Sequence, residues 1–188
     1  DQLPRRFGRL GVPLGHESFL RMPISDYQKL IEGLSGFEII DASNLLHRIR
    51  FVKSPAEIAK IAHVCEITSD AFEFLPATMK TGESEREICT RMRIDLLQRG
   101  ADSSPYLISG SGPGGYESII MGPTERVQKP GDVMIIDTGT TFDGYFCDFD
   151  RNFTFDHADD AVRRAYHVVY DATDAGFAAA KPGATTSD

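Results

Sequence analysis

Three aspartates with the chemistry of a metal site lie within the segment Gly131–Phe153, which reads GDVMIIDTGTTFDGYFCDFDRNF. Asp137 follows a run of four apolar residues, and Asp148 and Asp150 come after a short polar turn. Hard divalent cations prefer carboxylate oxygens as ligands, and a rigid support for closely spaced carboxylates is the simplest way to supply them. The residue types and their spacing make this segment the first candidate for a functional site.

A β-hairpin is the element that must position these carboxylates. Asp143-Gly144 is a two-residue turn signal, with an apolar strand before it and an aromatic-rich strand after it. In an antiparallel pair, the residue numbers of two facing residues always add up to the same value. A loop with an even number of residues makes that value odd. Odd positions of the first strand then share a face with even positions of the second. The predicted faces are Asp137, Asp148 and Asp150 on one side, and Ile136, Cys147 and Phe149 on the other.

Carboxylates placed in this way need a compensating group. Like charges that face one another destabilise a sheet, and a half-buried carboxylate without a partner costs several kcal/mol. A shared proton, an Arg or Lys, or a metal ion could each provide the compensation. In the plainer alternative, Asp143 is a turn residue, Asp148 and Asp150 are edge-strand charges, and Arg151 pairs with one of them.

The segment closely resembles the first metal-ligand pair of the pita-bread metallopeptidases, which include prolidases, aminopeptidase P, methionine aminopeptidases and their relative creatinase. In that family a Gly-Asp pair precedes apolar residues, Asp-x-Gly, a turn with Gly-Tyr, and Asp-x-Thr-Arg-Thr. The matching residues here are Gly131-Asp132, Asp137, Gly139, Gly144-Tyr145, Asp148 and Arg151. The two threonines are replaced by Asp150 and Asn152, so the surroundings of the metals differ from the usual pattern.

The resemblance implies an α+β protein with a partial pita-bread fold and a two-metal site. Asp137 and Asp148 are the implied metal ligands, with Asp150 and Arg151 behind them, while catalytic and substrate-binding residues stay unassigned. The implied cofactors are two divalent ions per site, Mn, Co or Zn. The implied activity is Xaa-Pro dipeptidase- or aminopeptidase-like hydrolysis of an amide bond by an activated water, in a homodimer that acts on a small peptide.

The remaining elements fit this organisation. Residues 1–48 contain two short strands and two short helices, which resemble the end of an amino-terminal creatinase-like domain. Residues 49–188 resemble the first half of the catalytic domain. This half should begin with a helix at Ser54-Pro55-Ala56-Glu57, which carries cap, first-turn Pro and capping-box signals. A second helix should run from Ser84 or Glu85 to Leu97, and a long one from Ala158 to Lys181.

Two departures from the family bear on function. The family carries a His twelve residues before the Asp of the Gly-Asp pair, and Ile120 stands there in this chain. Ile cannot donate a hydrogen bond or move a proton. This favours a rival activity, that of a C–N hydrolase or a lyase acting on a small non-peptide metabolite, as in creatinase- or ectoine-hydrolase-like enzymes. A non-catalytic pita-bread binding module is a third alternative. In addition, the His and two Glu ligands that the family supplies later do not occur before Asp188, so this chain alone should bind metal weakly and not turn over substrate.

Composition excludes some classes of partner. The 188 residues carry a net charge of −8 and are 41% hydrophobic, with a pI near 5.1. This charge argues against nucleic acid or an anionic membrane as the main partner. The sequence shows neither a signal-peptide pattern nor an apolar run of membrane-span length. Three widely spaced cysteines, Cys65, Cys89 and Cys147, indicate reduced thiols in a cytoplasmic protein.

Overall fold

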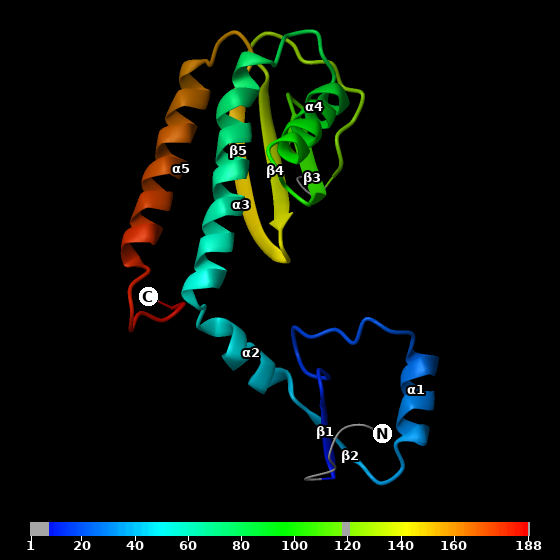
Figure 1. Ribbon diagram of the computed structural model, residues 1–188. Helices are drawn as coiled ribbons and strands as arrows, with labels where there is room; N and C mark the ends of the chain where they lie inside the picture. Colours follow the sequence, from blue (N-terminus) through cyan, green and yellow to red (C-terminus); the bar gives the residue numbers. More distant parts are fainter. Residues whose placement is uncertain (1–7, 118–120, 188) are drawn as a thin grey trace. The chain divides into compact units, whose positions relative to one another are not determined.

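The computed structural model describes residues 8–117 and 121–187 (Figure 1). The chain divides into two compact units, Asp1–Ala56 and Glu57–Asp188. Ile120, where the family's His is missing, lies outside the described residues. So does most of a strand that the sequence predicts over Glu117–Met121.

The first unit is a small β–α–β arrangement followed by a helix. β1 (Arg9–Val12) and β2 (Glu38–Asp41) pair in parallel, with α1 (Ile24–Gly33) between them in sequence, and α2 (Ser43–Phe51) follows. These elements confirm the two short strands and two short helices that the sequence predicts. Among the described residues of this unit only Val12 and Ser43 are buried, because two strands and two short helices enclose little area.

The second unit contains an antiparallel sheet of three strands, ordered β3 (Ser103–Ser111), β4 (Val133–Phe142) and β5 (Tyr145–Thr154). Asp143 and Gly144 form the turn between β4 and β5, with φ angles of +47° and +79° that suit a tight hairpin. The pairing runs without a shift from Phe142↔Tyr145 to Val133↔Thr154. The predicted hairpin is confirmed, and so are its two predicted faces.

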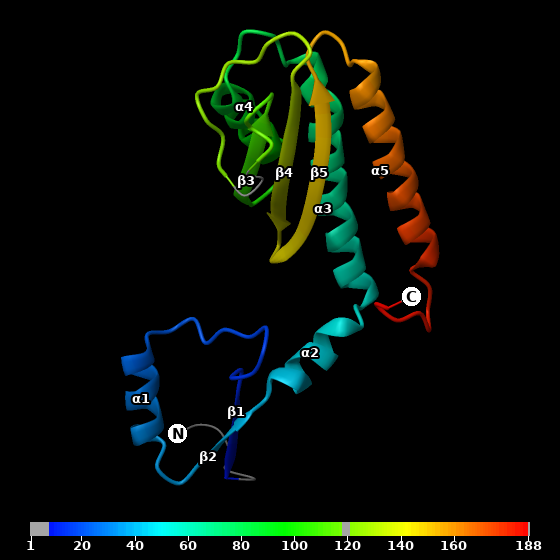
Figure 2. The same ribbon diagram turned by 180° about the vertical axis from the view of Figure 1, so that it is seen from behind.

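Helices cover one face of this sheet. α3 (Pro55–Phe74) continues into the short 3₁₀ helix η1 (Leu75–Ala77), and α4 (Glu85–Gln98) follows. α3 lies in front of β5 in Figure 1 and behind it in the reverse view of Figure 2. The core between the helices and the sheet is apolar; its fully enclosed members include Ile88, Met92, Leu96, Met134 and Ile136. The opposite face of the sheet carries the three aspartates.

Local signals in the sequence fix the ends of these helices. Ser84 caps α4: its Oγ accepts from the Glu87 N–H at 3.2 Å, and the Glu87 carboxylate accepts from the Ser84 N–H at 2.8 Å. This reciprocal pair satisfies two backbone donors that a helix start leaves open. The start of α4 is thereby held at the position that the sequence predicts.

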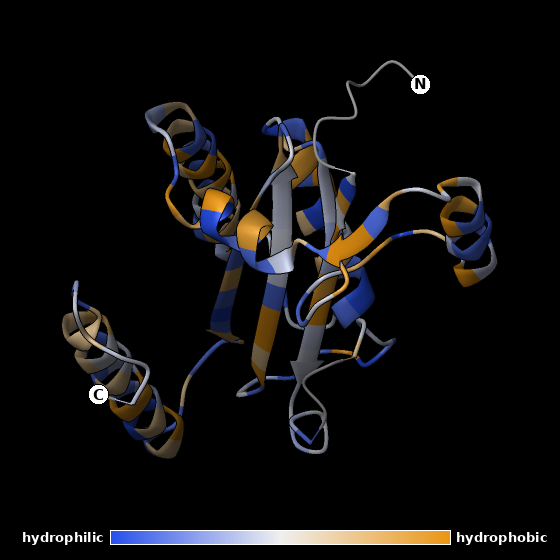
Figure 3. Cartoon of the chain, turned by 90° about the horizontal axis from the view of Figure 1, so that it is seen from below, coloured by the Kyte–Doolittle hydropathy of each residue, from blue (hydrophilic) through white to orange (hydrophobic). Residues whose placement is uncertain are grey.

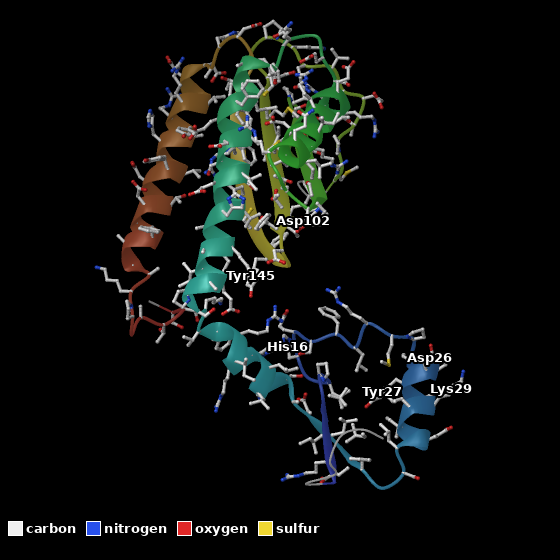
Figure 4. All side chains as sticks on the ribbon, in the orientation of Figure 1. His16, Asp26, Tyr27, Lys29, Asp102 and Tyr145 are labelled. Atoms are coloured by element: carbon white, nitrogen blue, oxygen red, sulfur yellow. The ribbon has the colours of Figure 1, made fainter. Side chains whose placement is uncertain are left out.

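The tip of the β4–β5 hairpin is tied to its neighbours. Lys60 of α3 forms an ion pair with Asp143 at 2.5 Å, and the Tyr145 hydroxyl donates to Glu57 at 3.0 Å. The Asp143 N–H donates to the Asp102 carboxylate at 2.6 Å; Figure 4 labels Asp102 and Tyr145. These contacts hold the turn against the first turns of α3 and the start of β3, so the hairpin offers a firm support for the side chains along it.

α5 (Asp160–Ala179) is the last helix among the described residues. Asp159 caps it by accepting from the Val162 N–H at 2.8 Å. Apolar segments recur along this helix (Figure 3), yet none of its residues is buried, and Phe177 is 85% exposed. Within residues 8–117 and 121–187, no helix has the length and apolar character needed to cross a membrane.

Candidate metal centre

The register of the hairpin places three carboxylates on the sheet face that the helices leave uncovered. Asp137 of β4 pairs directly with Asp150 of β5, and Asp148 pairs with Gly139, two positions along the same face. Facing side chains on an antiparallel pair lie about 5 Å apart and diagonal ones about 7–8 Å. Asp137 therefore has one carboxylate opposite it and a second on the diagonal.

Asp137 is the least solvated of the three acids. Its side chain is partly buried, and its Oδ1 atom is buried with no hydrogen-bond partner among the described residues. Burial raises the pKa of Asp137, and the negative charges of Asp148 and Asp150 raise it further. Burial is also the main cause of the raised pKa of Asp150. An unpaired buried oxygen among like charges is an unfavourable arrangement that a bound cation would relieve.

Tyr106 supplies a hydrogen-bond donor on this face. β3 pairs Tyr106 with Gly139, and the Tyr106 hydroxyl donates to Oδ1 of Asp148. Burial and this hydrogen bond raise the pKa of Tyr106, so the phenol stays protonated and able to donate at neutral pH. Sequence reasoning missed this residue. The alternation of side chains along β3 predicts its position on this face only if the β3–β4 register is known. That register shifts between Ser103 and Tyr106.

Gly139 makes the close approach of Tyr106 possible. A Cβ atom built at this position would lie 2.6 Å from Cε1 of Tyr106 and 2.1 Å from Cζ of Phe146. Both distances are well below van der Waals contact, so only a residue without a side chain leaves room for both rings. The packing of these two rings on the carboxylate face therefore explains why a glycine stands at this position of the Asp-x-Gly sequence.

Arg151 does not pair with the carboxylates. It lies on the helix-covered face, where its guanidinium is 5.2 Å from the ring centre of Phe149 and 5.8 Å from that of Phe72. Its Nη1 donates to the backbone carbonyl of Asp150 at 2.7 Å. In the part of the chain that the structure describes, no ion pair involves Asp137, Asp148 or Asp150. The alternative in which Arg151 forms an ion pair with one of them is wrong.

The donor set fits a hard divalent cation but is incomplete for one. Carboxylate oxygens on a common face, one of them buried and unpaired, have the chemistry that such ions require. Within the described ranges, however, no three His, Cys, Asp or Glu side chains come together as a metal cage. Asp137 and Asp148 can therefore supply part of a coordination shell that needs about six donors.

A second polar cluster secures the start of β4. Glu85 and Ser111 are 2% and 0% exposed, and the Ser111 hydroxyl donates to the Glu85 carboxylate. Arg126 donates to Ser111 at 3.2 Å and to the buried Asp132 at 2.7 Å. The Glu85 carboxylate also accepts from the Thr124 N–H at 2.9 Å and from its hydroxyl at 2.7 Å. These bonds tie the start of α4, the end of β3 and the approach to β4 into one unit.

Comparison with known proteins gives consistent matches. Residues 59–188 match metallopeptidase family M24. The chain is 29% identical over 170 residues to the uncharacterized peptidase YqhT of Bacillus subtilis (strain 168), which covers 87% of this chain and 46% of that protein. It is also 29% identical over 149 residues to an Xaa-Pro dipeptidase of Lactobacillus helveticus, with 79% of this chain and 40% of that one covered.

Solved structures agree with these matches. The prolidase from Thermococcus sibiricus superimposes with a TM-score of 0.76 at 25% identity, covering 89% of this chain and 44% of that one. An X-Pro aminopeptidase from Thermotoga maritima MSB8 gives 0.74 at 23% identity over 88% of this chain and 46% of that one, which is a likeness of fold. The chain spans about half the length of the proteins that it matches.

Proposed function

Because the chain belongs to metallopeptidase family M24 and has part of its pita-bread fold, we propose that the protein is a two-metal hydrolase of the Xaa-Pro dipeptidase or aminopeptidase type. The observation that carries the proposal is the buried, unpaired Oδ1 of Asp137 on the face that also bears Asp148. Its substrate would be a small peptide, cleaved at an amide bond.

Asp137 and Asp148 would hold the ions, which are Mn, Co or Zn, two per site. When bound, divalent ions supply positive charge that makes a water nucleophilic near neutral pH and stabilises the negative charge that develops on the substrate's carbonyl oxygen. Asp137 and Asp148 would each act as a ligand. Since such ions need about six donors, these two residues by themselves would bind metal weakly.

Two further residues would tune this face. The Tyr106 hydroxyl holds one oxygen of Asp148 in place, which leaves the other oxygen free to face a cation. Asp150 faces Asp137 and adds a third negative charge, so it would strengthen cation binding without being a ligand itself. Arg151 would act from the other face, by packing on Phe149 and Phe72 behind the strand that carries the ligands.

We assign the two regions by the same reasoning. Residues 1–48 would be the end of an amino-terminal creatinase-like domain, and residues 49–188 the first half of the catalytic domain. A cytoplasmic homodimer is the assembly that the family resemblance favours.

Ile120 supports one alternative. Because it stands where the family has a proton-transferring His, the second candidate activity is that of a C–N hydrolase or a lyase acting on a small non-peptide metabolite.

The test is release of proline from Ala-Pro and Leu-Pro by the full-length protein, loaded in turn with Mn²⁺, Co²⁺ and Zn²⁺. We expect turnover that Asp148→Asn and Asp137→Asn each reduce at least about a hundredfold, as expected for loss of a metal ligand. Asp156→Asn is the matched control, since it removes the same charge at a position that bonds Thr81 instead. If the protein binds metal but cleaves neither dipeptide, the peptidase proposal is rejected, and activity on a non-peptide metabolite becomes the leading hypothesis.

A further inference from the structure

Cys147 lies on the helix-covered face of β5, directly behind the strand position of Asp148. Its side chain is 5% exposed. Its Sγ is 3.1 Å from the Thr68 hydroxyl and 3.6 Å from the Val64 carbonyl oxygen, both on α3. The thiol is therefore fixed against one turn of the helix, between residues 64 and 68.

Cys65 belongs to that same turn. It follows Val64 and precedes Thr68 by three positions, so its side chain projects from the part of α3 that Cys147 touches. Burial raises the pKa of the Cys65 thiol, and the nearby Cys147 thiol raises it further. Cys65 is partly exposed while Cys147 is not. One thiol of the pair can thus be reached from solvent, and the other is held beside it.

Cys89 contrasts with the partly exposed Cys65. It is 0% exposed, and burial raises the pKa of its thiol to about 12. It lies on α4 and serves as an internal reference for a cysteine that packs and does not react.

We propose that Cys65 and Cys147 form a reversible oxidation site, which a hydroperoxide converts into a disulfide between α3 and β5. The Cys65 sulfur attacks the peroxide oxygen and becomes a sulfenic acid, releasing an alcohol, or water when the oxidant is hydrogen peroxide. Cys147 then attacks that sulfur, the S–O bond breaks, and water leaves as the S–S bond forms. Two thiols lose two hydrogens in total, and the peroxide O–O bond is reduced.

The bridge would lie behind the proposed metal ligand. Side chains at 147 and 148 point to opposite faces of the sheet, so the disulfide would not touch the carboxylates but would fasten their strand to α3. Because burial raises the pKa of Cys65, bridging should be slow at neutral pH and faster under mildly alkaline conditions. This behaviour suits a response to sustained oxidation more than a rapid sensor.

The test is intact and peptide mass spectrometry of the chain after treatment with hydrogen peroxide, followed by blocking of remaining thiols. Trypsin separates the three cysteines into peptides 61–80, 127–151 and 87–91. We expect one species lighter by two hydrogens, in which peptides 61–80 and 127–151 are joined and peptide 87–91 carries the blocking group. Cys65→Ser should abolish the joined species, Cys89→Ala should leave it unchanged, and dithiothreitol should separate the two peptides.

Three results would overturn the proposal. One is oxidation of Cys65 to sulfinic acid with no joined peptide, and another is a bridge that forms only between two copies of the chain. The third is a bridged chain with a lower urea midpoint than the reduced one, because that would mean that the native geometry does not accommodate the bond. The wild-type peptide map decides the matter even if a substituted chain fails to fold.

Discussion

Replacing Gly139 by Ala should disturb the carboxylate face while leaving the fold intact. The added methyl group would lie 2.1 Å from Phe146 Cζ and 2.6 Å from Tyr106 Cε1, against an ordinary contact distance of 3.4 Å. The Phe146 ring must then move by about 1.3 Å and the Tyr106 ring by about 0.8 Å. Phe146 is 46% exposed, so its ring can swing toward solvent.

The cost follows from these movements. Holding a side chain away from its preferred rotamer costs about 0.5–1.5 kcal/mol, so two displaced rings predict a loss of about 1–3 kcal/mol in the free energy of unfolding. The displaced Tyr106 hydroxyl should also lose its bond to Asp148. Urea unfolding followed by far-UV circular dichroism measures the loss of unfolding free energy. Tyrosine-sensitised luminescence of Tb³⁺ added to the protein should report the displacement of Tyr106 from the carboxylates.

A double-mutant cycle tests the cause. Phe146→Ala alone should cost about 1 kcal/mol, because only about half of its ring is buried, and it also removes the main obstacle to the new methyl group. Gly139→Ala combined with Phe146→Ala should therefore be more stable than the sum of the single effects by about 1 kcal/mol. Gly122→Ala, where a Cβ would meet nothing within 4 Å, is the control and should be close to neutral. Additive effects of the two substitutions would refute the steric reasoning.

Three further predictions concern charge and hydrogen bonding. Tyr106→Phe should keep the fold but weaken Mn²⁺ binding about three- to tenfold, measured by calorimetry, since Asp148 loses its donor. Asp137→Asn should raise the free energy of unfolding of the metal-free chain at pH 7 by up to about 1 kcal/mol, measured by urea unfolding. The reason is that the raised pKa of Asp137 makes its charged form unfavourable in the fold; the gain should shrink as pH falls through that pKa, where the wild-type carboxyl becomes neutral. Asp132→Asn should lower the free energy of unfolding by about 1–3 kcal/mol at pH 7, because Asp132 pairs with Arg126. The Arg126 guanidinium lowers the pKa of Asp132 in the folded state. In acid-unfolding curves this difference should therefore persist above the unfolded pKa near 4 and be lost progressively as pH falls from there through the lower folded pKa.

The hairpin and its faces could be predicted from sequence because their determinants are local. The Asp143-Gly144 turn has two residues, and the strands on either side continue without a bulge, so counting along the chain was enough. The start of α4 was equally readable, since Ser84 and Glu87 are three residues apart and cap the helix between themselves. Local signals of this kind need no knowledge of the rest of the fold.

Features that depend on distant segments were not predictable. The bond from Tyr106 to Asp148 requires the β3–β4 register, and the joining segment spans more than twenty residues. On α3 the apolar pattern places Ile58 on the inner face, yet it is 56% exposed, whereas the polar Thr68 is 0% exposed beside Cys147. The buried cluster around Glu85 was not predictable either, because a charged residue is expected to be exposed unless its distant partners are known.

The two-residue turn also limits how this protein can change during evolution. Adding one residue between Asp143 and Gly144 would exchange the faces of every position that follows on β5. It would turn Asp148 toward the packed helices and bring Phe149 out beside Asp137, unless a bulge absorbed the change. We therefore expect length variation at this turn among functional descendants to occur in steps of two residues, or to be accompanied by a compensating bulge before Asp148.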